Sequence, residues 1–160
     1  MLLSDRRAFL LGFAALGACG FEPVYGTSGA ASGLRGSILV DEPTNRQQFQ
    51  LTEQLEQRLG RAPDPQYGLS VKLTVREEGL AISGSNDITR YNVLGKADFV
   101  LRDMISGTPV YSDTVNTFTA YSASSQPVAT LSAERDATAR LMIALADMIV
   151  TKQQINAGDL

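Results

Sequence analysis

Cys19 is the residue whose surroundings most clearly indicate a particular chemistry, and it is the chain's only cysteine. It follows an apolar run that ends in Leu16, Gly17 and Ala18. A lipoprotein signal peptidase needs small residues beside the cysteine and a leucine three positions before it, because the enzyme fits an extended backbone into a narrow site. We therefore predict that residues 1–18 form a lipoprotein signal peptide and that the Cys19 thiol is lipidated.

The other reactive side chains do not form a catalytic set. The sequence has no histidine and no second cysteine, which excludes a Ser-His-Asp triad, a Cys-His pair and a Cys/His zinc site. The adjacent carboxylates Glu77-Glu78 and Asp41-Glu42 lie at the ends of expected strands, where neighbouring side chains point to opposite faces. We predict that the protein is not an enzyme and has no catalytic residues, metal or cofactor.

The signal peptide has the features of an export signal. Arg6 and Arg7 supply the positive charge, and the apolar run 8–18 is too short to span a bilayer, which takes about 20 residues as a helix. A buried helix at the start of the domain is the less favoured interpretation of this run. Residues 5–10 also resemble a twin-arginine signal, with Leu11 where the consensus has lysine. Sec export and twin-arginine export both remain open.

Residues 19–33 are expected to be a lipidated tether. Each acyl methylene adds about 0.8 kcal/mol of membrane affinity, so two or three chains on Cys19 would hold the protein on a membrane. Gly20 replaces the aspartate that typically retains lipoproteins at the inner membrane, which favours the periplasmic side of the outer membrane. Residues 21–25 place two aromatics around a proline, and we expect them to dock on the domain or to lie among lipid headgroups. Residues 26–33 are small and flexible.

The remaining chain, 34–160, is long enough for one domain with one core. The chain is 44% hydrophobic and carries a net charge of −3, so neither wholesale disorder nor the basic footprint of a nucleic-acid-binding protein is expected. Its periodicity predicts the order β-α-β-β-β-α, with both helices on one face of a four-stranded, largely antiparallel sheet in a two-layer α+β domain. The expected strands cover 34–40, 69–76, 91–101 and 110–121, and the expected helices cover 44–59 and 132–153.

Several local features support these elements. Thr44 and Gln47 have capping-box spacing, and Ser106-Gly107 is typical of a hairpin turn. Glu134 and Asp136 are expected in the first turn of the last helix. The first helix should bury Leu51, Leu55 and Leu59, and the last should bury Ala137, Leu141, Ala144, Leu145 and Met148.

Basic side chains on the expected strands are candidates for contact with anionic groups. Lys72 and Arg76 share one face of their strand, and Lys96 and Arg102 share a face of another. Arg90 lies where that second strand begins. A merely solvated surface is the alternative interpretation of these scattered charges.

The sequence resembles the LptE family, the lipopolysaccharide-assembly lipoproteins of Gram-negative bacteria. The resemblance rests on Cys-Gly-Phe-Glu-Pro-Val-Tyr at 19–25, Thr-Arg-Tyr at 89–91, Ser-Ala-Glu-Arg-Asp at 132–136 and the order of the elements. It implies an outer-membrane lipoprotein that sits inside an LptD-type β-barrel, helps the barrel to assemble, and contacts lipopolysaccharide in transit.

The resemblance also implies where anionic lipid would be contacted. Family members place basic residues near the loop between the second and third strands and near the start of the last helix. Arg90 and Arg135 match those places, and Lys96 is a further candidate. The loop 83–87 departs from the pattern because it has no basic residue and ends in Asp87.

Two alternatives to this function remain. One is an auxiliary lipoprotein of an ABC-type lipid transport system, which would work without a barrel. The other is an envelope lipoprotein with a purely structural role.

Replacing the predicted lipidation site tests the first inference. Cys19→Ser should leave a full-length, unacylated precursor, because serine offers no thiol for the diacylglycerol thioether. Precursor size and incorporation of labelled palmitate measure this. Normal cleavage and labelling of the variant would contradict lipidation at Cys19.

Overall fold

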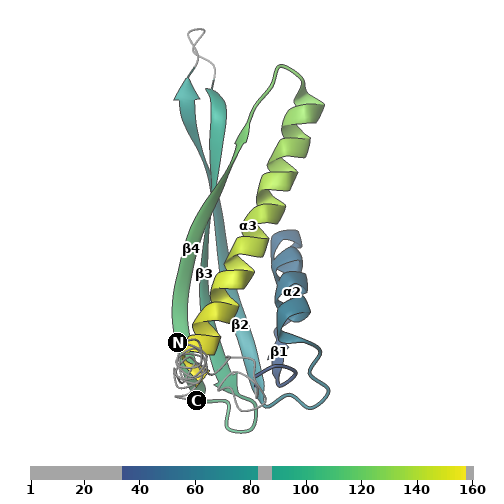
Figure 1. Cartoon of the computed structure of the whole chain (residues 1–160), viewed down its shortest axis with the longest axis vertical. Helices are drawn as coiled ribbons and strands as arrows, with labels where there is room; N and C mark the ends of the chain where they lie inside the picture. Colours follow the sequence, from purple (N-terminus) through teal and green to yellow (C-terminus); the bar gives the residue numbers. More distant parts are fainter. Residues whose placement is uncertain (1–33, 83–87, 158–160) are drawn as a thin grey trace, which may run out of the picture.

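The computed structural model describes residues 34–82 and 88–157. The predicted signal peptide, Cys19, the tether and the loop 83–87 lie outside the described residues, so these predictions stay predictions. The described elements, in chain order, are β1 (Ile38–Val40), α2 (Arg46–Leu59), β2 (Tyr67–Ile82), β3 (Ile88–Asp103), β4 (Pro109–Ser122) and α3 (Pro127–Ile155) (Figure 1).

The strands form one sheet in the order β1-β2-β3-β4. The β2–β3 and β3–β4 pairs are antiparallel, whereas β1 pairs with β2 in parallel, from Ile38↔Tyr67 to Val40↔Leu69. A parallel pair needs a crossover connection, and α2 supplies it. Figure 1 shows α2 beside the half of the sheet nearest β1, while α3 runs along most of the sheet's length. The predicted α+β fold class and largely antiparallel sheet are confirmed.

The two central strands are longer than the sequence pattern predicted. β2 and β3 each have 16 residues, and pairing continues past Arg76 through Glu77↔Val93 and Gly79↔Tyr91. The alternation of apolar and polar residues breaks at Glu77, a charged residue on the helix-covered face. Glu77 is exposed at this position, and its carboxylate accepts a hydrogen bond from the Tyr121 hydroxyl. The short predicted strands were therefore wrong at this end.

Helix α2 begins one residue later than its capping box predicted. Asn45, not Thr44, is the N-cap, and its side-chain oxygen accepts a hydrogen bond from the backbone N–H of Gln48 at 2.9 Å. The Gln48 side chain in turn accepts from the backbone N–H of Thr44 at 2.8 Å. This reciprocal pair has the logic of a capping box in a shifted register. Gly60, with φ of 80°, ends the helix as the sequence predicted.

Helix α3 begins at Pro127, earlier than predicted, because proline is a favoured residue in the first turn of a helix. No acidic residue lies in that first turn, so the placement of Glu134 and Asp136 there was wrong. Lys152 does lie in the last turn, where a positive charge is favourable.

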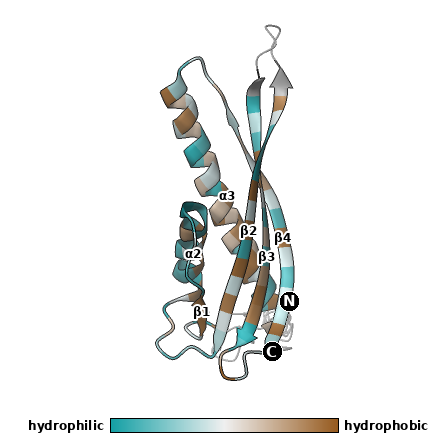
Figure 2. Ribbon diagram, turned by 180° about the vertical axis from the view of Figure 1, so that it is seen from behind, coloured by the Kyte–Doolittle hydropathy of each residue, from teal (hydrophilic) through white to brown (hydrophobic). Residues whose placement is uncertain are grey.

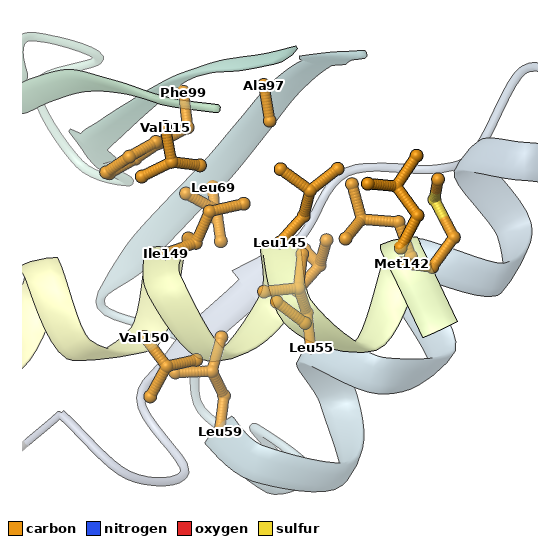
Figure 3. Packing of buried hydrophobic residues seen from close by; sticks show 14 of the residues in the cluster. Leu55, Leu59, Leu69, Ala97, Phe99, Val115, Met142, Leu145, Ile149 and Val150 are labelled. Carbon is orange, nitrogen blue, oxygen red and sulfur yellow. The ribbon is translucent and has the colours of Figure 1, made fainter. Parts of the chain in front are cut away.

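The buried face of α3 is broader than the predicted stripe because the helix packs on both the sheet and α2. Ala137, Leu141 and Leu145 are buried as expected, but Met148 is 37% exposed. Figure 3 shows Leu145 and Ile149 facing the sheet residues Phe99 and Val115, while Val150 lies against Leu59 of α2. The predicted α2 stripe of Leu51, Leu55 and Leu59 is confirmed as buried.

Gly95 marks the closest approach of α3 to the sheet. A Cβ atom placed there would lie 2.9 Å from Leu145 Cδ1 and 3.0 Å from Leu141 Cδ2. Both leucines are fully buried, so they have little space in which to move. Only glycine fits at this crossing.

A polar cluster fastens the last turn of α3 to β4. Lys152 Nζ lies 2.8 Å from Asp113 Oδ2, and the Tyr111 hydroxyl donates to the same oxygen at 3.0 Å. Asn156 Nδ2 donates to the Tyr111 hydroxyl at 3.0 Å. The hydrogen bonds from Lys152, from the Thr114 backbone N–H and from the Tyr111 hydroxyl lower the pKa of Asp113 to about 2.

Gln153 is a buried polar side chain whose amide lacks hydrogen-bond partners in the described chain. It is 1% exposed, and neither Nε2 nor Oε1 has a hydrogen-bond partner among the described residues. An unsatisfied buried polar group costs about 1–3 kcal/mol.

Replacing Gln153 by methionine should therefore stabilise the fold by about 1 kcal/mol, because methionine has a similar shape without the amide. Gln153→Glu should destabilise it by burying a charge. Gln57→Met, on the exposed surface of α2, is the matched control and should change little. Chemical denaturation measures all three, and a loss of stability in Gln153→Met would contradict the prediction.

Candidate functional site

The sheet face opposite the helices is the candidate functional surface. Apolar β2 residues such as Leu69 and Val71 point toward the helices, and the intervening Ser70 and Lys72 point the other way. The ribbon colours in Figure 2 alternate along the strands accordingly. No described helix packs on this second face, which we call the open face.

Strand register gathers the basic residues of two strands on the open face. Lys72 and Arg76 share a face of β2, as predicted. Lys96 of β3 lies opposite Thr74, the residue midway between them. Directly opposed residues point to the same side of a sheet, so all three cations project together. The sequence alone did not show that the two strands present them to one side.

These residues line a concavity of about 570 Å³ on the open face. Its wall includes Leu94 and Phe118, and the Phe118 ring is 63% exposed. The other lining side chains are uncharged or paired and include Thr74, Asn116 and Asp98. The surface thus places positive charge beside exposed apolar area.

Asp98 partly neutralises the cluster. It lies 2.8 Å from Lys96 Nζ and accepts a hydrogen bond from the Thr114 hydroxyl at 2.6 Å. The hydrogen bond from Lys96, that from Thr114 and the charge of Lys72 lower the pKa of Asp98, so it stays ionised. Within the described chain, Lys72 and Arg76 form no ion pair. They are the cations of this concavity that are available to a ligand.

A bidentate ion pair closes the end of the open face near β1. Arg102 Nη1 and Nη2 donate to the two carboxylate oxygens of Asp41 at 2.9 and 2.6 Å. This pair raises the pKa of Arg102 and joins β3 to the residue after β1. Arg102 therefore has a structural role, because its guanidinium is already paired with Asp41.

The other candidate contacts lie away from this cluster. Arg90 is on the open face, opposite Ser122, but six residues from Lys96, or roughly 20 Å along β3. Arg135 is exposed on α3, in the helix layer, and it is not in the first turn as the resemblance implied. The structure groups Lys96 with Lys72 and Arg76, and it does not bring Lys96, Arg90 and Arg135 together.

The described residues form neither a cluster of metal ligands nor a helix suited to crossing a membrane. Within 34–82 and 88–157, no three carboxylate, histidine or cysteine side chains gather closely enough to hold a metal ion. Neither α2 nor α3, the two helices described, has the length and apolar character needed to cross a bilayer. The open face suits non-covalent binding of a group that is anionic at one end and apolar at the other.

Comparison with known proteins adds the family. The model of a family described as lipopolysaccharide-assembly matches residues 36–152, which cover the whole described fold except its ends. The chain belongs to the LptE family. The similarity predicted from the tether and element order is thus confirmed over the folded domain.

Solved structures share the LptE architecture. A candidate lipoprotein of Caulobacter crescentus CB15 is 24% identical with a TM-score of 0.66, covering 81% of this chain and 96% of its own. Rare lipoprotein B of Shewanella oneidensis is 12% identical with a TM-score of 0.59, covering 77% and 96%. A minor lipoprotein of Acinetobacter baumannii is 18% identical with a TM-score of 0.56, covering 74% and 89%. At these identities the likeness shows the fold. No curated protein sequence matches the chain significantly.

Proposed function

We propose that this LptE-family protein is an outer-membrane lipoprotein that assists assembly of an LptD-type β-barrel and insertion of lipopolysaccharide into the outer membrane. The family match supports the pathway, and the lipidation motif at Cys19 supports the membrane attachment. The helix layer encloses the core, so the open face remains for a partner or a lipid.

The proposed contact with lipid rests on the group of basic residues on the open face. Lys72 and Arg76 present unpaired charge, and Phe118 presents apolar area in the same concavity. A phosphate of lipopolysaccharide would be held by the cations, and adjacent hydrocarbon would cover the ring. Arg90 extends the positive surface along β3, and Arg135 supplies a separate cation on α3.

Depletion of the protein tests the barrel role. We expect the LptD-type barrel to accumulate in an unfolded form, visible as loss of its heat-modifiable mobility on a gel. Lipopolysaccharide accessible to antibody at the cell surface should fall with it. Normal barrel folding and normal lipopolysaccharide export would contradict the proposal. Recovery of an ATPase–permease complex with the protein, in place of a barrel, would favour the transporter accessory.

Charge variants test the lipid interaction separately. Lys72→Gln/Arg76→Gln should weaken binding to purified lipopolysaccharide by about tenfold for each cation removed, because each cation would donate a charge-assisted hydrogen bond to the phosphate. Asp98→Asn should strengthen binding, because it releases Lys96 from its carboxylate partner.

Arg46→Gln is the matched control for these variants, since Arg46 is exposed on α2, away from the open face. Binding of a fluorescent lipopolysaccharide at two salt concentrations gives the affinities. Equal losses of affinity in the control and the double variant would show that lipopolysaccharide does not bind to the open face.

A further inference from the structure

The outer edge of β1 carries hydrogen-bonding groups that no described residue uses. On its inner side, Ser37 O accepts from Tyr67 N–H at 3.0 Å, and Asp41 N–H donates to Leu69 O at 2.9 Å. Alternate residues of a parallel strand face the same neighbour. The peptide groups of Ile38 and Val40 therefore point away from β2, on a side where the described sheet has no further strand.

A groove runs along this edge, between β1 and the C-terminal half of α2. It has a volume of about 310 Å³, and its floor and walls include β1, Gln57, Gly60 and Ala62. Leu39 lies beside it and is 43% exposed. Exposed edge strands usually carry a charge, a proline or a bulge that prevents further pairing. The sequence Ile38-Leu39-Val40 has none of these.

The chain itself supplies a segment that fits this edge. The described chain begins at Leu34, four residues before β1, and residues 21–25 precede it by eight residues. Those eight residues, 26–33, can span about 26 Å when extended, and their glycines and serines allow the chain to reverse. Phe21, Val24 and Tyr25 are strong strand formers.

We propose that residues 21–25 fold back as a fifth strand, antiparallel to β1 and seated along this groove. The inference goes beyond the barrel and lipid contacts above and does not rest on them.

Proline selects the register of this added strand. Pro23 has no N–H, so it is tolerated only where its nitrogen faces outward. Val24 and Glu22 then pair with the outward-facing Ile38 and Val40, and Pro23 lies opposite Leu39. In this register Pro23, Phe21 and Tyr25 share the face of Leu39 and cover its exposed side chain, while Val24 points to the groove side.

Charge in the groove opposes Glu22, the one charged residue of the segment. Glu53 and Glu56 face the groove, and Arg61 is the basic residue in its lining. Glu22→Gln should therefore strengthen docking. With residues 21–25 in place, Cys19 lies beyond the Val40 end of β1, and the acyl chains leave the domain from the β1 edge of the sheet.

Disulfide trapping in the full chain tests the contact. Pro23→Cys/Leu39→Cys should form an internal disulfide in the periplasm, because opposed residues on adjacent strands bring their Cβ atoms within bridging distance. Pro23→Cys/Val110→Cys is the matched control. Val110 is 41% exposed, close to the exposure of Leu39, and lies near the start of β4, the opposite edge strand.

Free thiols are counted by maleimide mass labelling before and after reduction, and oligomers are read on a non-reducing gel. We expect no free introduced thiols in the Leu39 pair and two in the Val110 pair. Equal crosslinking in both pairs, or none in the Leu39 pair, would overturn the proposal. A disulfide-linked dimer through Leu39 would also overturn it, since it would assign the edge to a second copy. After reduction, both introduced thiols are labelled, so a third labelled thiol would come from unacylated Cys19. This count separates failure of lipidation from failure of docking.

Hydrogen exchange provides a measurement without new cysteines. Val24→Pro removes an inward-facing N–H and should speed exchange of the Ile38 and Val40 amides by on the order of tenfold. Ser28→Pro, between the proposed strand and Leu34, is the control and should leave both amides unchanged. Unchanged exchange in Val24→Pro would contradict the added strand.

Discussion

The crossing of α3 over β3 at Gly95 is the contact on which the rest of the structure depends. Because this position has no side chain, Leu141 and Leu145 reach the sheet and bring the long helix down onto it. The same helix presents Val150 and Met142 toward α2. Helix α3 therefore packs against both the sheet and the other helix. Burial of these side chains uses the apolar residues of one sheet face and leaves the other without a described cover.

The one-sided sheet explains the character of the candidate site. Residues that alternate with the core positions meet solvent, a lipid or a partner. Most are threonine, serine, asparagine or charged, and Leu94 and Phe118 are apolar exceptions. Among the described residues, Lys72 and Arg76 form no ion pair there, whereas Arg102 is held by Asp41 and Lys96 by Asp98. Binding specificity would arise from two cations and one exposed ring, in a chain whose net charge is negative.

Sequence patterns predicted the order of the elements, the α+β class and the buried leucines of α2, because these follow from periodicity within single elements. They failed where contacts between elements decide. Glu77 ends the apolar alternation, yet Tyr121 accommodates its carboxylate and pairing with Val93 continues the strand. The spacing of Lys72 and Arg76 within one strand showed that they share a face. Only the pairing of Thr74 with Lys96 showed that Lys96, on the next strand, lies on the same face. The start of α3 was missed because its first turns are not packed: Val128 and Leu131 are exposed, and the buried stripe begins only at Ala137.

The parallel pairing of β1 determines how the domain would respond to force. A pull on the chain before Leu34, directly or through a segment paired with the outer edge of β1, loads β1. This strand joins the sheet through three register pairs, the hydrogen bonds at its two ends and the Asp41–Arg102 bridge. The β2–β3–β4 meander pairs over far longer stretches and lies behind β1 along the path of the load. Tension from the N-terminal side would therefore peel away β1 and leave the meander with α3 intact. β1 would thus be the first described element to detach from the folded body under tension from the N-terminal side.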